Sequence, residues 1–132
     1  MAEIKQIAIA AANWWTSKLA NPTINNFRTG NNTTTDQLIS LAGLSHARSH
    51  LATKELLEYF CDTLTQRIEF ELSCASEIYI YCDSSPCYLL KDVATSSGIK
   101  LCLFPYHCSM WISPSSIRVK DGYGANIVRI CI

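Results

Sequence analysis

The sequence predicts an α+β domain in which N-terminal helices pack on a mixed sheet of four to five strands. Apolar residues recur at helical spacing through residues 1–74, whereas short β-branched and aromatic runs follow from residue 77 onward. Proline and glycine separate these later runs where turns are expected. With 132 residues, 48 % of them apolar, the chain predicts a single domain over 1–132, with a helical region over residues 1–74 and a strand-rich region over residues 77–132.

The first expected helix begins near Ile4 and stops at Asn21-Pro22, because proline lacks an N–H and disfavours helical geometry in the preceding residue. One face of this helix carries apolar residues spaced three or four apart: Ile4, Ile7, Ala8, Ala11, Trp15 and Leu19. The segment 21–35 is rich in asparagine and threonine and predicts a mobile loop.

Two further helices are expected before residue 75. Thr34 and Gln37 have the spacing of a capping box, which predicts a helix running to about His50. Its expected core residues are Leu38, Leu41, Ala42 and Leu44. Thr53 is a suitable cap for the third helix. The apolar stripe of that helix consists of Leu57, Phe60, Cys61, Leu64, Ile68 and Leu72.

The strand-rich region begins with a predicted strand over 77–82, and a second strand is expected over 100–104. Between them, the helix-start pair Ser85-Pro86 and the helix-ending Gly98 predict a short helix. A strand, a helix and a strand with short joints predict a right-handed parallel crossover.

The remaining residues predict antiparallel strands joined by turns. Strands over 109–113 and 116–120 flank Pro114-Ser115 and indicate a hairpin. The glycine-containing turn 122–124 then leads into a last strand over 126–132, where the side chains alternate.

The charge of the chain narrows the class of partner. Lys+Arg and Asp+Glu number 11 each, which argues against an acidic nucleic-acid mimic and equally against a strongly basic nucleic-acid binder. The charges are unevenly placed, with residues 51–98 acidic and residues 99–132 basic. Solvated helix faces account for this pattern, and attraction between copies in a homo-oligomer is the alternative.

The number of cysteines indicates the cellular compartment of the protein but does not point to a catalysed reaction. Seven cysteines without a secretory signal or a membrane-length apolar run indicate a reducing cytoplasm and buried free thiols. Candidate ligands for a structural zinc at the strand ends are Cys82, Cys87, Cys102 and Cys108. His46 and His50 stand four apart and permit a second site, although the helix dipole alone accounts for histidines at a helix end. Buried thiols and helix-ending histidines are the simpler interpretation, so no metal or cofactor is predicted.

No complete catalytic motif is present, so the chain is not predicted to be an enzyme. Cys108 and His107 supply a thiol and an imidazole, but neighbours in a strand point to opposite faces and do not form a direct pair. The Gly122-Tyr123-Gly124 turn leads into a strand rather than a helix, which excludes a phosphate-binding P-loop.

A basic and aromatic surface is expected on the C-terminal strands. The residues that indicate it are Tyr106, Trp111, Arg118, Lys120, Tyr123 and Arg129. Aromatic rings beside arginine suit a nucleotide base with its phosphates, and they also suit a protein interface. An ordinary sheet face with solvated charges is the alternative. Trp14 and Trp15 point about 100° apart on a helix, so one of them can anchor a partner or a second copy.

The C-terminal block resembles a group of small phage proteins. It consists of Phe104-Pro105-Tyr106, Met110-Trp111-Ile112, Val119 and Gly122-Tyr123-Gly124-Ala125. Together with the Trp14-Trp15 pair, it resembles uncharacterised accessory proteins of bacteriophages and prophages. In their pattern a Trp-Lys pair follows the proline, whereas this chain has Tyr106-His107, so a function tied to that lysine does not carry over. The resemblance implies an antagonist of bacterial defence, such as an anti-CRISPR protein or a sponge for immune nucleotide signals.

We therefore expect a non-catalytic, cytoplasmic protein that inhibits a bacterial defence component by stoichiometric binding. The alternative is a small-ligand binder that sequesters a nucleotide signal, and the third possibility is a metal-stabilised structural protein. The expected partner or ligand contacts are Trp15, Tyr106, His107, Met110, Trp111, Arg118, Lys120 and Tyr123.

Overall fold

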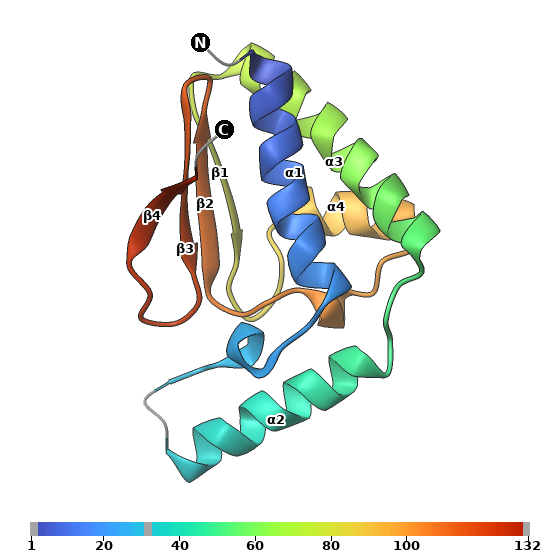
Figure 1. Ribbon diagram of the computed structural model, residues 1–132, viewed down its shortest axis with the longest axis vertical. Coiled ribbons are helices and arrows are strands. Elements are labelled where there is room, and N and C mark those ends of the chain that lie inside the picture. The colour runs from blue at the N-terminus through green and yellow to red at the C-terminus, as the bar shows by residue number, and fades with distance from the viewer. Residues whose placement is uncertain (1–2, 31–32, 131–132) are drawn as a thin grey trace.

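The computed structural model describes residues 3–30 and 33–130 and confirms the α+β class (Figure 1). In chain order the elements are α1 (Ile4–Ala20), η1 (Ile24–Phe27), α2 (Thr34–Arg48), α3 (Lys54–Cys74), β1 (Ile78–Cys82), α4 (Tyr88–Ser97), η2 (Leu101–Leu103), β2 (Cys108–Ser113), β3 (Ser116–Asp121) and β4 (Ile127–Ile130). The elements η1 and η2 are short 3₁₀ helices. No helix in these two ranges is long and apolar enough to span a membrane.

The four strands form one antiparallel sheet in the order β1-β2-β3-β4. The parallel crossover expected from residues 100–104 does not form, because Leu101–Leu103 coils into η2 instead. The backbone N–H groups of Leu103 and Phe104 donate to the carbonyls three residues earlier, at 3.1 and 3.2 Å. Pro105 follows immediately and has no N–H for a ladder, so this apolar run could not have continued as a central strand. The last two residues of the strand expected over 126–132 lie outside the described residues.

The helices lie on one side of the sheet. Helix α1 packs against β2 and β3, α4 packs against β1, and α3 lies outside them in contact with both α1 and α4. Figure 1 shows α2 apart from this body, near η1 and the end of α1. In the described ranges of the chain, no helix covers the opposite face of the sheet. We call that surface the open face.

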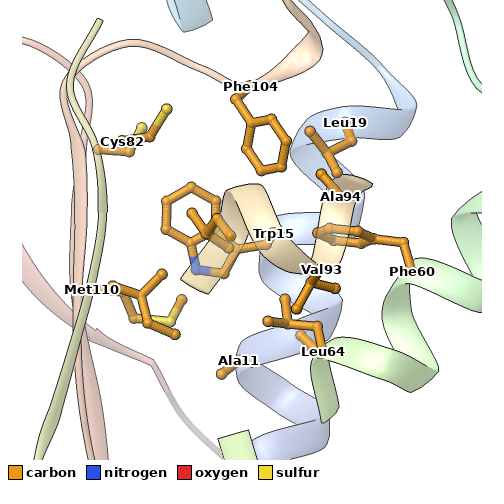
Figure 2. Packing of buried hydrophobic residues seen from close by; sticks show 14 of the residues in the cluster. Ala11, Trp15, Leu19, Phe60, Leu64, Cys82, Val93, Ala94, Phe104 and Met110 are labelled. Atoms are coloured by element: carbon orange, nitrogen blue, oxygen red, sulfur yellow. The ribbon is translucent and has the colours of Figure 1, made fainter. Parts of the chain in front are cut away.

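The core is built around Trp15. Its side chain is completely buried, and Figure 2 shows it between Met110 of β2 and Phe60 of α3. The predicted stripes of α1 and α3 supply most of the helical contribution, with Ile7, Leu19, Leu64 and Ile68 also at 0 % exposure. The spacing of apolar residues therefore placed both long helices correctly.

Helix α2 buries a different face from the one that most of its expected core residues define. Leu44 is buried as predicted, but Leu38, Leu41 and Ala42 are exposed, and Ser40 and Ala47 complete the buried face instead. The cause is Phe27 of η1, which is completely buried and packs against α2 at Gly43. A Cβ atom at Gly43 would lie 3.2 Å from Phe27 Cδ1, so glycine lets the helix approach this ring closely. The segment 21–35 was predicted as a mobile loop, yet it contains this core residue.

Helix ends differ from the predictions by a few residues. Thr33, rather than Thr34, caps α2 and accepts a hydrogen bond from the Asp36 N–H at 3.1 Å. Thr53 caps α3 as predicted, and Gly98 ends α4 with φ of 76°, a conformation that glycine adopts without a steric penalty. Helix α4 begins at Tyr88 rather than at Pro86, because Pro86 forms a bridge with Cys82.

Candidate functional site

The open face carries two rows of side chains that cross all four strands. Residues directly opposite in antiparallel strands point to the same side, and the pairing continues from strand to strand. The first row consists of Tyr79, Trp111, Arg118 and Arg129. The second row consists of Tyr81, Ser109, Lys120 and Ile127. The residues between them along the strands, such as Ile80, Met110 and Val119, are buried against the helices.

Three aromatic rings on the open face are stacked against one another, and we call them the aromatic stack. Tyr79 is the central ring, with its centroid 5.1 Å from that of Tyr81 and 5.4 Å from that of Trp111. The planes are tilted by 22° and 24°. The Tyr79 hydroxyl also lies 3.0 Å from Ser109 Oγ, which fixes the direction of the ring. The stack is therefore held in place before any ligand arrives.

Three cations, Arg118, Lys120 and Arg129, share the open face with the aromatic stack. Arg118 Cζ lies 5.9 Å from the centroid of the Trp111 ring, within the range of a cation–π contact. Its Nη2 is 3.7 Å from Glu77 Oε2, but both side chains are about half exposed, so this pair contributes little to stability. Among the described residues, no carboxylate pairs with Lys120 or Arg129. The open face is thus both aromatic and positively charged.

A hollow of about 380 Å³ adjoins the aromatic stack where β1 ends and β2 begins, and we call it the rim pocket. Its lining consists of Tyr79, Tyr81, Cys82, Asp83, His107, Cys108, Ser109 and Lys120. His107 Nδ1 lies 2.7 Å from Asp83 Oδ1, and the His107 N–H donates to the Asp83 carbonyl at 3.0 Å. These contacts hold His107 at φ of 57°, a left-handed conformation that is uncommon outside glycine. The pocket therefore has an aromatic wall, an imidazole–carboxylate pair and a lysine.

The structure places only some of the expected contact residues on this surface. Trp111, Arg118 and Lys120 lie on the open face, and His107 lines the rim pocket. Tyr123 is exposed and meets the His107 ring edge-on, with centroids 5.5 Å apart.

Three other residues that were expected to contact a partner are fully or partly buried. Trp15 and Met110 are completely buried, because their places in α1 and β2 turn them toward the core, so they are not contact residues. Tyr106 is half-buried, with its ring edge-on to Phe27 at 5.2 Å. Trp14 is the partly exposed member of the tryptophan pair, and Lys18 Nζ lies 5.1 Å from its ring centroid.

Tyr79 and Tyr81 lie on the open face but were not among the expected contacts. Arg129, which was expected on the basic and aromatic surface, also lies on the open face. The signal for the two tyrosines was present, because Ile78, Ile80 and Cys82 alternate with them and supply the core side of the strand.

The four cysteines that were candidate zinc ligands do not all lie together. Cys82 and Cys108 are directly opposite across β1 and β2 on the buried face, with Cys87 also buried. Cys102 lies elsewhere, beside His46 and His50. His107 precedes β2 and has a left-handed backbone, so the strand alternation expected for the Cys108–His107 pair does not apply to it. Cys108 Sγ donates instead to the Tyr106 carbonyl and to Asp121 Oδ1, both at 3.6 Å, and among the described residues no hydrogen bond joins it to the imidazole.

Burial controls the chemistry of the central thiols. Desolvation raises the pKa of Cys108 to about 12, with the neighbouring Asp121 carboxylate as a second cause. Desolvation likewise raises the pKa of Cys82 far above its ordinary value, with Cys108 and Cys87 adding to the effect. Because the thiolate is the reactive form, neither cysteine is a suitable nucleophile at neutral pH.

We expect Cys82 and Cys108 to resist alkylation by iodoacetamide in the folded protein at pH 8, while the exposed Cys74 reacts. The rise of the Cys108 pKa from 9.0 to about 12 alone lowers its thiolate fraction about a thousandfold. Peptide mass spectrometry after timed labelling measures each site. Urea-unfolded protein is the control, in which all sites should react alike; rapid native labelling of Cys108 would contradict its burial.

The same pKa shift predicts lower stability in alkali. An unfolded Cys108 begins to lose its proton near its ordinary pKa of 9.0, whereas the folded thiol keeps its proton until about 12. The folded state therefore binds more protons between these values, and the free energy of unfolding falls as the pH rises through them.

No protein-family model matches the chain, and no curated protein matches it either.

Proposed function

We propose that the protein is a non-catalytic binding protein that inhibits a bacterial defence component by stoichiometric contact through the open face. The observation that carries the proposal is the row Tyr79, Trp111, Arg118 and Arg129, which crosses the whole sheet where no described helix covers it. Tryptophan, tyrosine and arginine are the residues most enriched at interface hot spots. This row brings all three together on one surface.

Preorganisation and charge support this use of the open face. The three stacked rings already have fixed positions, so a partner would not have to immobilise flexible side chains on binding. Arg118, Lys120 and Arg129 favour a partner whose matching surface is acidic, because complementary charge speeds association and excludes wrong partners.

The choice of a defence component follows from the sequence resemblance. Within the block that resembles small phage proteins, Trp111 lies on the open face, while Met110 and Ile112 form part of the core beneath it. A phage protein of this kind would act in the cytoplasm of its bacterial host. Tyr106 and His107, at which this chain differs from the phage proteins, do not belong to the row of residues that carries the proposal.

The rim pocket favours a second candidate function, the sequestration of a nucleotide signal. Its volume of about 380 Å³ falls within the range of small-molecule sites. Tyr81 offers a ring on which a base can stack, and Lys120 offers a cation for a phosphate. Asp83 and His107 supply hydrogen-bonding groups at the same place.

We expect Trp111→Ala to weaken binding of the partner by at least about 30-fold, which corresponds to the roughly 2 kcal/mol of a hot-spot residue. Wild-type and variant proteins are used as parallel baits in a bacterial lysate, and captured proteins are then purified and titrated. Phe70→Ala is the matched control, since Phe70 is an exposed aromatic residue (63 %) on α3. A partner that binds Trp111→Ala and wild type equally would exclude the open face.

The nucleotide candidate is tested by thermal shift against a panel of mono- and cyclic dinucleotides. A ligand at a hundred times its Kd adds about 2.7 kcal/mol of apparent stability. Lys120→Ala should remove that shift, whereas Lys91→Ala on α4, outside the pocket lining, should leave it unchanged. No stabilisation by any nucleotide would contradict this candidate and leave the protein-binding proposal intact.

A further inference from the structure

Two histidines and a cysteine converge at the junction of α2 and η2. One ring nitrogen from each of His46 and His50 and the Sγ atom of Cys102 all lie within 4.8 Å of one another. Of the possible three-residue groups of metal-ligating side chains in residues 3–30 and 33–130, this is the one that meets such a distance. Neither the open face nor the rim pocket contains any of the three residues.

The backbone explains why the two histidines meet. Helix α2 ends at Arg48, and the chain remains coiled for one further turn, with the His50 N–H donating to the Ala47 carbonyl at 3.0 Å. His50 is therefore kept close to His46, four residues earlier, with ring centroids 4.6 Å apart. The rings are tilted by 56° rather than stacked flat, so they do not simply pack face to face.

The hydrogen bonds of His50 determine its tautomer. Its Nδ1 lies 3.0 Å from the His46 carbonyl oxygen, which can only accept. It also lies 3.0 Å from Ser49 Oγ, whose own hydroxyl donates to the same carbonyl at 2.7 Å. Nδ1 must therefore carry the proton, and Nε2 keeps a free lone pair. Metal-binding histidines typically donate their other ring N–H to a backbone carbonyl in this way.

We propose that His46, His50 and Cys102 form a Zn²⁺ site that joins the C-terminal end of α2 to η2. Imidazole and thiolate are the ligands that zinc prefers, at about 2.0–2.1 Å for nitrogen and 2.3 Å for sulfur. A tetrahedral ion with these bonds needs ligand atoms about 3.3–3.6 Å apart, so small side-chain rotations close the site. Both histidines are exposed and Cys102 is partly exposed, so solvent reaches the fourth position.

The position of the site gives the ion a structural consequence. Helix α2 packs mainly on η1 and η2 rather than on the sheet or the long helices. A metal bridge from His46 and His50 to Cys102 would fix the C-terminal end of α2 to η2 and, through it, to the rest of the protein. It would complement the contact of Phe27 with Gly43 in the middle of the helix.

Cobalt(II) is the best probe because it can occupy zinc sites and, unlike zinc, has an absorption spectrum that depends on the ligands bound to it. Metal-free, untagged, full-length protein is titrated with Co²⁺ and then with Zn²⁺. We expect one equivalent of Co²⁺ to produce the visible bands of a tetrahedral site and a thiolate-to-cobalt charge-transfer band, and Zn²⁺ to displace it. Cys102→Ser should abolish the charge-transfer band, and His46→Gln or His50→Gln should weaken binding at least about tenfold.

Cys74→Ser is the matched control, because Cys74 is exposed on α3 and does not belong to the cluster. Circular dichroism of each variant establishes that it is folded before titration. Hydrogen exchange with and without Zn²⁺ gives a second readout, with protection expected at the end of α2. Cys74→Ser should keep the thiolate band. The proposal is overturned if the wild type binds no Co²⁺ at stoichiometric concentration, or if the thiolate band survives in Cys102→Ser.

Discussion

Replacement of Trp15 by alanine is expected to lower the free energy of unfolding by about 3–5 kcal/mol. The side chain is completely buried between the sheet and the helices, so its removal leaves a large cavity next to Met110 and Phe60 (Figure 2). A loss of this size approaches the whole stability of a small domain. Urea unfolding followed by circular dichroism measures the effect.

Trp14→Ala is the matched control for this experiment. Trp14 neighbours Trp15 in sequence and contacts it edge-on, with centroids 4.9 Å apart, but it is only partly buried. Its replacement should cost about 1–2 kcal/mol, because some of its surface already meets water. Equal losses for the two variants would contradict the central position of Trp15.

Trp15→Phe separates packing from hydrogen bonding at the same position. The indole Nε1 is buried, and among the described residues it has no hydrogen-bond partner. A buried donor without an acceptor costs about 1–3 kcal/mol, and phenylalanine removes this donor while retaining most of the ring. We therefore expect Trp15→Phe to lose less than about 1.5 kcal/mol; a loss equal to that of alanine would show that the N–H is satisfied.

Phe27→Ala is expected to release α2 from the rest of the protein. Phe27 contacts the helix at Gly43 and the Tyr106 ring at 5.2 Å, so one side chain joins three segments. Removing a buried phenylalanine costs about 3–5 kcal/mol, and here the loss falls mainly on the contacts of α2.

Hydrogen exchange with mass spectrometry distinguishes local release from general weakening. In Phe27→Ala, amides of α2 should exchange much faster, while those of α1 and α3 remain comparatively protected. Ile24→Ala, in the same short helix but at a partly exposed residue (38 %), should change little. Equal acceleration in α2 and α3 would contradict this role.

The sequence predicted those elements whose pattern is long enough to identify one face. The stripes of α1 and α3 extend over several turns and led to the correct core residues. Helix α2 was assigned the wrong face because its true neighbour, Phe27, lies in an asparagine-rich segment with no regular period. The apolar run 100–104 was too short for its period to distinguish a strand from a 3₁₀ turn.

The candidate sites differ in how far the sequence could reveal them. The predicted hairpin at Pro114-Ser115, together with strand alternation, was sufficient to place Trp111 and Arg118 on one face. Alternation along the same strand should have excluded Met110. The row across four strands depends on register, which follows from pairing rather than from any single strand. The approach of Cys102 to His46 and His50 depends on the packing of η2 against α2, which no local pattern records.

The strand order of the sheet has a consequence for how the protein folds. Short turns join β2, β3 and β4, so these strands can pair early, because closing a short loop costs little entropy. Strand β1 pairs with β2 across the much longer segment 83–107, which contains α4 and η2, so this pairing requires a larger loop to close. Since β1 supplies Tyr79 and Tyr81, we expect the aromatic stack to be completed late in folding. A transient opening of β1 alone would then remove Tyr79 and Tyr81 from the open face, while β2, β3 and β4 stay paired.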